Sequence, residues 1–307
     1  MKSLVTGGAG FIGSNLVRAL ARRGDDVTVL DNFFTGYREN LEGFPVRLIE
    51  ADVRSTDAVR DAMRGRDRVF HLAASVGGPR SIENPRADLE VNLGGTLNVL
   101  EAARAESVRK IVFASSAGIF GALKQMPIRE DHPAEPDTPY GASKLGAEKL
   151  CLAYARLYPL AIVSLRYFNV YGPLQRYDGY GNVIPIFARR ILDGHAMVIH
   201  GDGGQTRDFV HVDDVVQATL KAGDAENLSG AFNIASGTSV TIEHLARLMR
   251  EFSGASAPIQ YGPPRKGDVR HSVADISAAR NAFGFQPAVK LDIGLRGYLS
   301  WAQEADR

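Results

Sequence analysis

The sequence predicts an α/β fold, with a doubly wound parallel sheet and a smaller, mixed lobe built mainly from the C-terminal part of the chain. The first observation behind this prediction is that short, almost wholly apolar runs recur up to about residue 165. Strands that are apolar at every position suit a sheet that is covered on both faces. The second is that amphipathic stretches separate these runs, and repeated strand–helix–strand units imply right-handed crossovers between parallel strands.

The expected elements follow one another in regular order. Strands are expected at 4–5, 27–30, 46–49, 69–72, 111–114 and 161–165, with helices at Phe11–Arg23, Thr56–Arg64, Ala87–Glu106 and Ser143–Tyr158. Residues 167–206 break the alternation because they are rich in Gly, Tyr and Pro around one expected helix at Ile184–Leu192. Sheet-and-helix patterns return at Phe209–Lys221 and Ala231–Ile234, and further helices are expected at Thr241–Phe252, Ile276–Phe283 and Ile293–Glu304.

Composition argues against several classes of protein. The 36 basic and 35 acidic residues nearly cancel, whereas a nucleic-acid-binding protein usually carries a basic excess or a basic run. The longest stretch without a charged side chain, 227–242, is rich in Ser, Thr, Asn and Gly, so we expect no membrane span. The single Cys151 cannot form an internal disulfide, which suits a reducing compartment, and no signal peptide precedes the first strand pattern. We therefore expect a cytoplasmic protein without a nucleic-acid or membrane partner.

A glycine-rich run follows the first expected strand and begins the first expected helix. In Thr6-Gly7-Gly8-Ala9-Gly10-Phe11-Ile12-Gly13, three of the glycines are spaced three residues apart. Gly7 permits a tight turn, Gly10 lets the backbone approach a pyrophosphate, and Gly13 lets the helix pack closely on the strand. The anion would lie at the helix N-terminus, where free N–H groups favour negative charge. The run predicts a dinucleotide-binding Rossmann fold, with a simple turn as the alternative.

The ends of the following strands support this interpretation. Asp31 ends the second strand, where a carboxylate accepts both ribose hydroxyls of NAD and repels the 2′-phosphate of NADP. Asp52-Val53 ends the third strand and would meet the adenine, whereas Ala73-Ala74 ends the fourth and leaves space beside the cofactor. We therefore expect NAD rather than NADP.

A tyrosine and a lysine form the candidate catalytic pair. In Tyr140-Gly141-Ala142-Ser143-Lys144 they lie four residues apart, so a helix that starts after Pro139 presents both on one face. A free tyrosine has a pKa near ~10, but a nearby ammonium and a cationic nicotinamide both favour the phenolate. Ser116, at the end of the fifth strand, would lie at the sheet edge where ligands bind in open α/β folds. An isolated Tyr-x-x-x-Lys is more often a pair on the surface of a helix. Here the pair follows the glycine run and the strands that end in Asp31 and Ser116, and this order along the chain favours a catalytic role.

The chain resembles the extended short-chain dehydrogenases/reductases and, more narrowly, the nucleotide-sugar 4-epimerases, of which UDP-glucose 4-epimerase is the best-known type. The resemblance covers nearly the whole chain. It rests on the glycine run, Asp31-Asn32, His71-Leu72-Ala73-Ala74, Val91-Asn92-Leu93-Gly94-Gly95-Thr96, Pro139–Lys144, Arg166–Pro173, Gly201-Asp202-Gly203 and Thr206–Asp214.

The resemblance implies roles for individual residues. Tyr140 would be the base, Lys144 its electrostatic partner and Ser116 the hydrogen-bond donor to O4 of the sugar. The implied NAD site contains Gly7, Gly10, Phe11, Ile12, Gly13, Asp31, Asn32, Asp52, Val53, Leu72, Ala73, Ala74, Asn92, Ser115, Tyr140, Lys144 and Tyr167. The implied substrate site contains Ser116, Tyr140, Asn169, Asn182, Val183, Arg207, Lys266 and Asp268. A UDP-sugar is the expected substrate, and a homodimer through a four-helix bundle is implied.

The residues after Ser116 distinguish related reactions. Relatives that expel water carry an Asp-Glu pair there and decarboxylases carry a Glu, whereas this chain has Ala117-Gly118-Ile119-Phe120. We therefore expect C4 epimerisation of UDP-glucose/UDP-galactose, and N-acetylated sugars would also fit if the small Ser272 borders the sugar. The alternatives are a UDP-glucuronate 4-epimerase, suggested by Arg176, another nucleotide-sugar epimerase or reductase, and a catalytically silent NAD-binding sensor.

The remaining expectations concern domains and other polar residues. Residues 1–166 and 207–236 are expected to form the NAD-binding domain, and 167–206 and 237–307 the nucleotide-sugar-binding lobe. The histidines show no metal-ligand spacing, so no metal is expected, and His71 is interpreted as a packed or hydrogen-bonded residue. Asp213-Asp214 are expected to cap the following helix.

Overall fold

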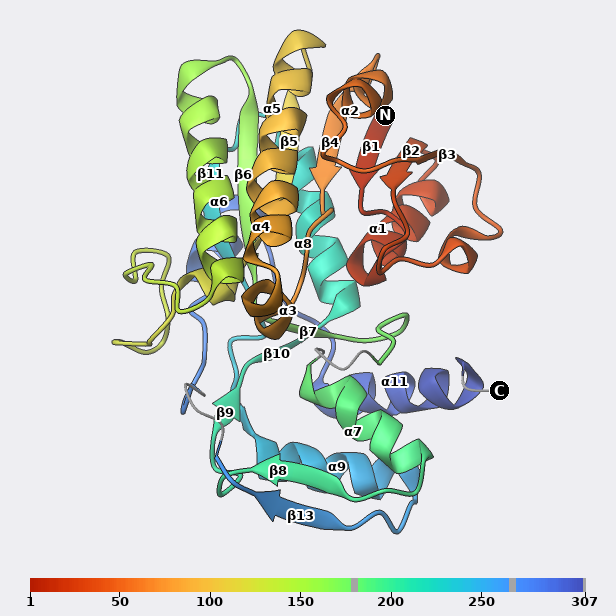
Figure 1. Cartoon of the computed structure of the whole chain (residues 1–307), viewed down its shortest axis with the longest axis vertical. Helices are drawn as coiled ribbons and strands as arrows, with labels where there is room; N and C mark the ends of the chain where they lie inside the picture. The colour runs from red at the N-terminus through yellow and green to blue at the C-terminus, as the bar shows by residue number, and fades with distance from the viewer. Residues whose placement is uncertain (178–181, 265–268, 306–307) are drawn as a thin grey trace.

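The computed structural model describes residues 1–177, 182–264 and 269–305. A seven-stranded sheet, in the order β11-β6-β5-β4-β1-β2-β3, forms the upper part of the molecule in Figure 1. Every neighbouring pair in this sheet is parallel. The strands are β1 Lys2–Thr6, β2 Asp26–Asp31, β3 Val46–Glu50, β4 Arg68–His71, β5 Lys110–Ser116, β6 Ala161–Tyr167 and β11 Gly230–Ile234. The predicted doubly wound parallel sheet is thus confirmed.

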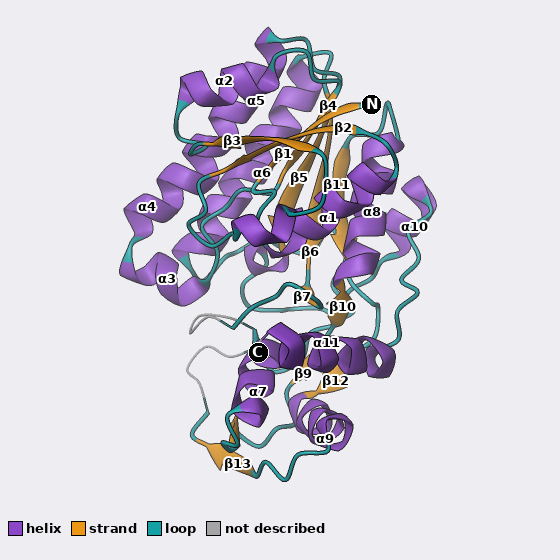
Figure 2. Cartoon of the chain, turned by 90° about the vertical axis from the view of Figure 1, so that its right-hand side faces the viewer, coloured by secondary structure: helices purple, strands orange, loops and turns teal. Residues whose placement is uncertain are grey.

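Helices cover both faces of the sheet. Figure 2 shows α2, α4, α5 and α6 on one side and α1, α8 and α10 on the other. Their bounds are α1 Phe11–Arg22, α2 Thr56–Met63, α3 Gly78–Glu83, α4 Pro85–Leu89, α5 Gly95–Ala105, α6 Pro139–Leu157, α8 Val212–Asp224 and α10 Ser277–Phe283. Coverage on both sides explains the apolar strands, since side chains that alternate between the faces of β5 all meet a core.

A third hydrophobic core lies in the lower part of the molecule, among α7, α9 and α11. These helices span Val183–Leu192, Ile242–Ser253 and Leu291–Ala305. Short two-stranded sheets complete this part: β7 Asn169–Tyr171 with β10 Phe209–His211, β9 Thr206–Arg207 with β12 Val240–Thr241, and β8 Met197–His200 with β13 Ile259–Gly262. Residues 274–285, which we assigned to the smaller lobe, instead place Ile276 and Phe285 in a core cluster that includes strands of the main sheet.

Two helical segments differ from their predicted extents for local reasons. The stretch expected as one helix over 87–106 is α4, a π-helical turn at Glu90–Gly94, and α5. Helix α6 begins at Pro139, as expected for the turn that carries Tyr140 and Lys144 but four residues before the amphipathic stretch at Ser143–Tyr158. The Thr138 hydroxyl accepts a hydrogen bond from the Gly141 N–H, and Pro139 takes the first position.

The expected capping role of Asp213 and Asp214 is wrong. His211 caps α8, since its Nδ1 accepts from the Asp213 N–H at 3.2 Å. Asp214 is buried, and its carboxylate accepts hydrogen bonds from the backbone N–H groups of Ala288 and Val289. It therefore ties the start of α8 to the segment that precedes α11. In the described parts of the chain, no helix combines the length and apolar character needed to cross a membrane.

Candidate active site

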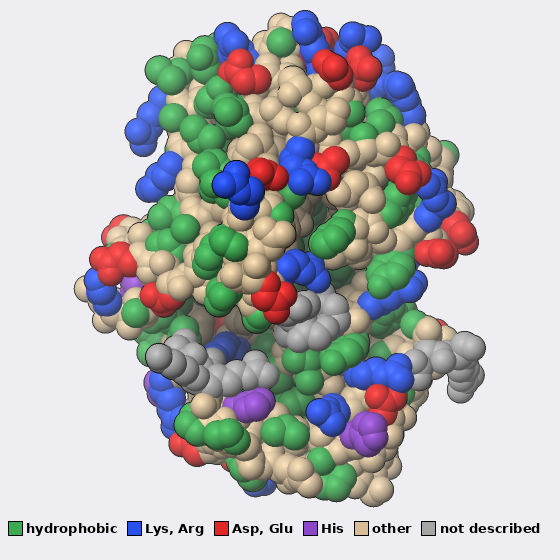
Figure 3. Space-filling view, in the orientation of Figure 1, with side chains coloured by type: hydrophobic (Ala, Val, Ile, Leu, Met, Phe, Trp, Pro, Cys, Tyr) green, Lys and Arg blue, Asp and Glu red, His purple; other side chains and the backbone are tan. Residues whose placement is uncertain are grey.

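A cavity of about 800 Å³ lies at the carboxyl ends of the parallel strands. It begins at the loop between β1 and α1 and passes the ends of β2, β4, β5 and β6 to the first turn of α6. Figure 3 shows a hollow near the middle of the molecule, with hydrophobic, basic and acidic side chains around it. Strand order reverses where β1 lies between β2 and β4, and open α/β sheets bind their ligands at such a switch point.

The glycine run is shaped by close backbone contacts. Gly7 has φ +71°, and a Cβ there would lie 2.6 Å from the Ala73 nitrogen. A Cβ at Gly13 would lie 2.0 Å from the Gly7 carbonyl oxygen, so α1 packs directly on the turn. A Cβ at Gly10 would meet the Gly7 oxygen at 3.3 Å, and Gly10 borders the cavity at the start of α1. Gly7 and Gly13 therefore serve the fold, whereas Gly10 leaves space for a ligand phosphate at a helix N-terminus.

The Asp31 carboxylate is held by backbone hydrogen bonds, one of them from the glycine run. Its Oδ2 accepts the Ala9 N–H at 2.8 Å and its Oδ1 accepts the Phe33 N–H at 2.8 Å. Burial raises the pKa of this carboxyl above its usual value, although the two hydrogen bonds act in the opposite direction. Each carboxylate oxygen retains a second lone pair for a ribose hydroxyl.

Asn32 and Asp52 lie beside Asp31 at the same end of the cavity. The Asn32 amide donates to Asp52 at 2.8 Å, and Arg54 donates to both oxygens of the same carboxylate. The hydrogen bonds from Arg54 lower the pKa of Asp52, so this group carries a negative charge. Val53 follows it as a buried apolar surface. The pair and the valine form the border at which an adenine is expected.

Tyr140 and Lys144 lie one helical turn apart in the first two turns of α6. Desolvation of the Tyr140 phenol raises its pKa, while a hydrogen bond with Ser116 lowers it. Lys144 is 2% exposed, and its ammonium lies 4.4 Å from the centre of the Phe113 ring. Burial lowers the pKa of Lys144 to about 8, against the opposing effect of nearby negative charges such as Asp88. The structure thus brings the predicted phenol, ammonium and hydroxyl together.

Gly118 explains why the Ser116 end of the cavity is open. The Gly118 N–H donates to the Ser116 hydroxyl oxygen at 3.1 Å. A Cβ on Gly118 would lie 3.3 Å from that oxygen and 3.5 Å from Cε1 of Tyr140. A side chain at this position would therefore project towards the reacting groups.

Most of the predicted site residues border the cavity, but not every side chain faces it. The bordering residues are Gly7, Gly10, Phe11, Ile12, Gly13, Asp31, Asn32, Asp52, Val53, Leu72, Ala73, Ala74, Ser115, Ser116, Tyr140, Lys144, Tyr167, Asn169 and Asn182. The Ser115 hydroxyl donates to Glu148 at 2.7 Å, within an ion pair between Glu148 and Arg166. The Tyr167 hydroxyl bonds to Thr219 at 2.7 Å. These two hydroxyls are engaged in the interior of the protein.

Four other residues lie away from the cavity that the described residues enclose: Asn92, Val183, Arg207 and Ser272. The Asn92 amide is bonded to the Ser75 backbone and to Ser143, and Val183 packs on the lower core. Arg207 donates to the carbonyl oxygens of Thr206 and Val269. Ser272 is buried, with its N–H directed to Thr206. The predicted Lys266 and Asp268 lie outside the described residues.

Sequence reasoning missed an aromatic segment at the cavity mouth. Phe34 and Tyr37 border the cavity, and both are exposed apolar side chains. The Arg80 guanidinium lies 5.4 Å from the Phe34 ring centre, and that of Arg176 lies 3.8 Å from the Tyr37 ring centre. The signal available in the sequence was three aromatic residues, Phe33, Phe34 and Tyr37, in a short loop directly after Asp31.

The interpretation of His71 is confirmed. Its ring nitrogens are hydrogen-bonded to Thr6 at 2.7 Å and to Thr96 at 3.0 Å. Burial lowers the pKa of His71 to about 3, so the ring is neutral at physiological pH. It supports the strand end next to Leu72, rather than acting as a charged group. Among the described residues, no group of three or more His, Cys, Asp and Glu is arranged to hold a metal ion.

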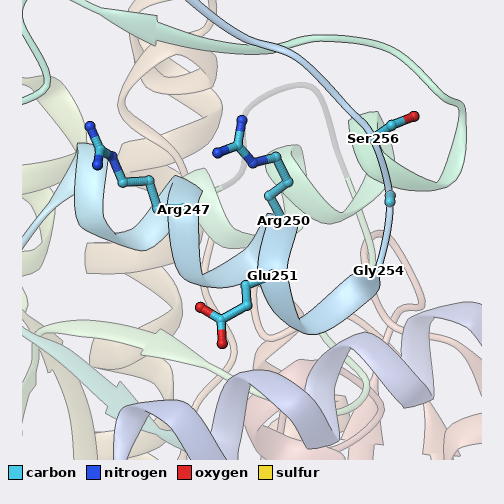
Figure 4. Close-up of a pocket in the computed structure, with 6 residues that line it drawn as sticks. Arg247, Arg250, Glu251, Gly254 and Ser256 are labelled. Atoms are coloured by element: carbon cyan, nitrogen blue, oxygen red, sulfur yellow. The ribbon is translucent and has the colours of Figure 1, made fainter.

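A second hollow, of about 630 Å³, lies at the end of α9 (Figure 4). Arg247 and Arg250 extend from the helix in one direction and Glu251 in the other, with Ser256 in the following loop. Arg247 is paired with Glu243 at 2.7 Å. This surface offers no base beside a nucleophile and lies in the lower part of the molecule, so the cavity at the sheet edge is the candidate active site.

Comparison with known proteins agrees with this geometry. The model of the NAD dependent epimerase/dehydratase family matches residues 3–235. The chain belongs to this family. A putative UDP-glucose 4-epimerase of Methanocaldococcus jannaschii is 38% identical to it over 99% of both chains.

Solved structures of epimerases share the whole fold. UDP-glucose 4-epimerase of Thermotoga maritima, determined with UDP-glucose, is 37% identical over 100% of both chains with a TM-score of 0.94. The UDP-glucose 4-epimerase of Thermus thermophilus, determined as a complex with NAD, is 40% identical, covers 99% of this chain and 100% of that chain, and has a TM-score of 0.89. Membership of the NAD dependent epimerase/dehydratase family confirms NAD as the cofactor. Gly10 borders the cavity at the N-terminus of α1, where free N–H groups suit a pyrophosphate.

Proposed function

We propose that this protein is an NAD-dependent 4-epimerase of nucleotide sugars that interconverts UDP-glucose and UDP-galactose. The observation that carries the proposal is the meeting of Tyr140, Ser116 and Lys144 in a cavity that begins at the glycine run. The cavity of about 800 Å³ has room for a sugar beside the nicotinamide end of a dinucleotide. The similarity to UDP-glucose 4-epimerases over the full chain supports this assignment.

The chain's residues divide the cavity into a cofactor end and a sugar end. Gly10 and the first turn of α1 hold the pyrophosphate, and Asp31 accepts the adenosine ribose hydroxyls. Lys144 holds the nicotinamide ribose. Asn169 and Asn182 also border the cavity, and we assign them to the nucleotide diphosphate of the substrate.

Proton transfer at C4 falls to Tyr140. When bound, NAD would supply the hydride acceptor for C4 of the sugar and the hydride donor to the opposite face. Tyr140 removes the proton from the 4-hydroxyl as the hydride leaves, and gives it back when the hydride returns. Ser116 donates a hydrogen bond to O4, and the Lys144 ammonium stabilises the phenolate. Because Gly118 has no side chain, nothing at this position projects towards Ser116 and Tyr140 while the ketosugar turns over between the two steps.

The charges around the cavity argue against related reactions. Among the described residues that border it, the carboxylates are Asp31 and Asp52, and both lie at the cofactor end. Dehydration and decarboxylation need acid–base groups beside C5 and C6, whereas C4 epimerisation needs Tyr, Lys, Ser and NAD. The retained Tyr140, Lys144 and Ser116 likewise argue against a silent sensor.

A second candidate substrate is UDP-glucuronate, because Arg176 borders the cavity and could pair with a 6-carboxylate. Arg176 lies against Tyr37, however, so carboxylate binding would compete with this contact. For an N-acetylated sugar, the supporting observation is that Gly118 places no side chain beside Ser116 and Tyr140. Ser272, which we expected to make that space, lies outside the described border of the cavity.

We also propose that two copies associate through α5 and α6. The two helices lie side by side on one face of the sheet, and Leu97 and Leu157 are exposed on them. Packing these faces across a two-fold axis would bury both leucines in a four-helix bundle. Light scattering after gel filtration tests this: a dimer that Leu97→Glu converts to a monomer supports the arrangement, and a monomeric wild-type protein contradicts it.

The experiment that tests the reaction is a panel of UDP-, dTDP- and GDP-sugars incubated with purified protein and no added cofactor. We expect C4 epimers of UDP-hexoses and bound NAD in the denatured enzyme's supernatant. Loss of water, loss of carbon dioxide or net reduction of any sugar would contradict the proposal.

A further inference from the structure

A buried carboxylate outside the cavity lies beside the catalytic pair. Asp88, on α4, is 1% exposed. Its Oδ1 accepts the Ser143 hydroxyl at 2.5 Å, and its Oδ2 has no hydrogen-bond partner among the described residues. An unpaired carboxylate oxygen in the interior is costly, so its retention calls for a reason other than packing.

Ser143 connects this carboxylate to the catalytic turn. It lies between Tyr140 and Lys144 on α6, and its side chain is buried. The Asn92 amide donates to the Ser143 oxygen at 3.0 Å, and it also donates to the Ser75 carbonyl oxygen and accepts the Ser75 N–H. A continuous chain of hydrogen bonds therefore runs from Asp88 through Ser143 and Asn92 to the loop at Ser75, which borders the cavity.

We propose that Asp88 is a positioning residue for the reaction, which acts through Ser143 and Asn92 to fix the first turns of α6 against the loop at Ser75. The proposal rests on the proposed role of Tyr140. This chain joins the helix that carries Tyr140 to the cavity wall at Ser75 by hydrogen bonds in addition to packing. The chain sets their separation, and catalytic rates fall steeply when reacting groups are displaced.

The charge of Asp88 also acts on both catalytic groups. Burial has the larger effect on the pKa of both groups. The charge of Asp88 adds to burial in raising the pKa of Tyr140, and it opposes burial by raising the pKa of Lys144. The other titratable groups near Lys144 are His71 from β4, which is neutral, and Glu148 and Cys151 from α6. Removing the charge while keeping the hydrogen bond should therefore lower the pKa of Tyr140.

Two variants separate position from charge. Asp88→Asn keeps an oxygen to accept from Ser143 but removes the charge, and Ser143→Ala keeps the charge but breaks the chain. We expect Asp88→Asn to move the acid limb of kcat towards lower pH, because Asp88 raises the pKa of Tyr140. We expect Ser143→Ala to lower kcat about three- to tenfold with little change in KM, and to leave the acid limb in place.

A measurement without turnover keeps this test separate from the proposed reaction. Ultraviolet difference titration of tyrosinate in the NAD-loaded enzyme, with Tyr140→Phe as the blank, gives the Tyr140 midpoint directly. The matched control is Glu90→Gln, because Glu90 lies two residues from Asp88 but is half-exposed beside Arg54. The charge of Glu90 is screened by water, so the Tyr140 midpoint in Glu90→Gln should equal that in the wild type.

The outcomes decide the proposal. A midpoint that moves down in Asp88→Asn and not in Glu90→Gln, together with the fall in kcat of Ser143→Ala, supports it. An unchanged Tyr140 midpoint in Asp88→Asn, or full kcat in Ser143→Ala, overturns it. If Asp88→Asn does not fold, judged by circular dichroism and bound NAD, kcat and KM of Ser143→Ala alone decide.

Discussion

The Ala9 N–H donates a hydrogen bond to the Asp31 carboxylate at 2.8 Å, so the residue expected to select the cofactor also holds the glycine run. The Ala9 carbonyl oxygen accepts from the Tyr37 N–H and from the Asn40 amide. The N–H and the carbonyl oxygen of Ala9 are thus both hydrogen-bonded before any ligand binds. The carboxylate that we propose to bind the ribose therefore also preorganises the turn that we propose to hold the pyrophosphate.

This relationship predicts a double effect of Asp31→Asn. NAD affinity should fall by about tenfold or more and discrimination against NADP should narrow, because an amide neither repels a phosphate nor accepts as strongly. Unfolding free energy should fall by roughly 1 kcal/mol as the turn loses a charged acceptor. Calorimetric titration of the cofactor-free protein measures the first effect and urea unfolding the second. Glu50→Gln is the control, since Glu50 pairs with Asp31 in register but is exposed; an unchanged NAD preference in Asp31→Asn would contradict the assignment.

Removing the Tyr140 hydroxyl should abolish most of the turnover. We expect Tyr140→Phe to lower kcat by roughly 10²–10⁴-fold, because the variant lacks the group that we propose takes the 4-hydroxyl proton. Bound NAD and the melting temperature should stay close to those of the wild type. Initial rates with UDP-galactose check this, and near-normal activity would show that the base is another residue.

The lowered pKa of Lys144 predicts a fall in activity on the alkaline side. Its ammonium is present below pH about 8 and is lost as the pH rises through that value, and with it the stabilisation of the Tyr140 phenolate. In Lys144→Arg the side chain stays protonated, so this alkaline limb should disappear even if kcat is lower throughout. Profiles of kcat/KM from pH 6 to 10 test this, and the same limb in both proteins would exclude Lys144 as its source.

Substitutions of Gly7 and Gly10 should impair different properties, the stability of the fold and the affinity for NAD. Gly7→Ala should destabilise the fold by about 1–3 kcal/mol, since its left-handed backbone and its contact with Ala73 leave no room for a methyl group. Gly10→Ala should change stability far less, yet weaken NAD by tenfold or more as the methyl group enters the phosphate space. Unfolding curves and NAD titrations on the pair decide this. Equal effects of both variants on NAD affinity and on stability would contradict it.

Neutral His71 predicts a loss of stability in acid. Its pKa is about 3 in the folded protein against 6.5 for an ordinary histidine, so between these values the unfolded chain binds a proton that the folded one does not. Stability should therefore fall by up to about 1.4 kcal/mol for each pH unit below 6.5 from this group alone. His71→Gln should be less stable at pH 7 but lack this part of the slope. Urea unfolding at pH 7, 6 and 5 measures it; parallel slopes would contradict the assignment.

The sheet and most of the cofactor border could be predicted because their signals are local. An apolar strand that ends in Asp31, or a helix start at Pro139, is set by a few neighbouring residues. Asn92 and Arg207 could not be placed from the sequence, since their partners Ser75 and Val269 are 17 and 62 residues away. The aromatic mouth at Phe34 and Tyr37 was missed for the same reason, because it is defined by arginines from distant elements.

The chain leaves the main sheet after β6 and returns to it in α8, β11 and again at residues 274–285. No single cut therefore releases a self-contained nucleotide-binding half. A fragment that ends at Arg166 would lack β11 and leave the long, apolar β6 as a bare sheet margin, prone to intermolecular pairing. Chimeras that swap sugar selectivity between relatives must accordingly exchange interleaved segments rather than a C-terminal block.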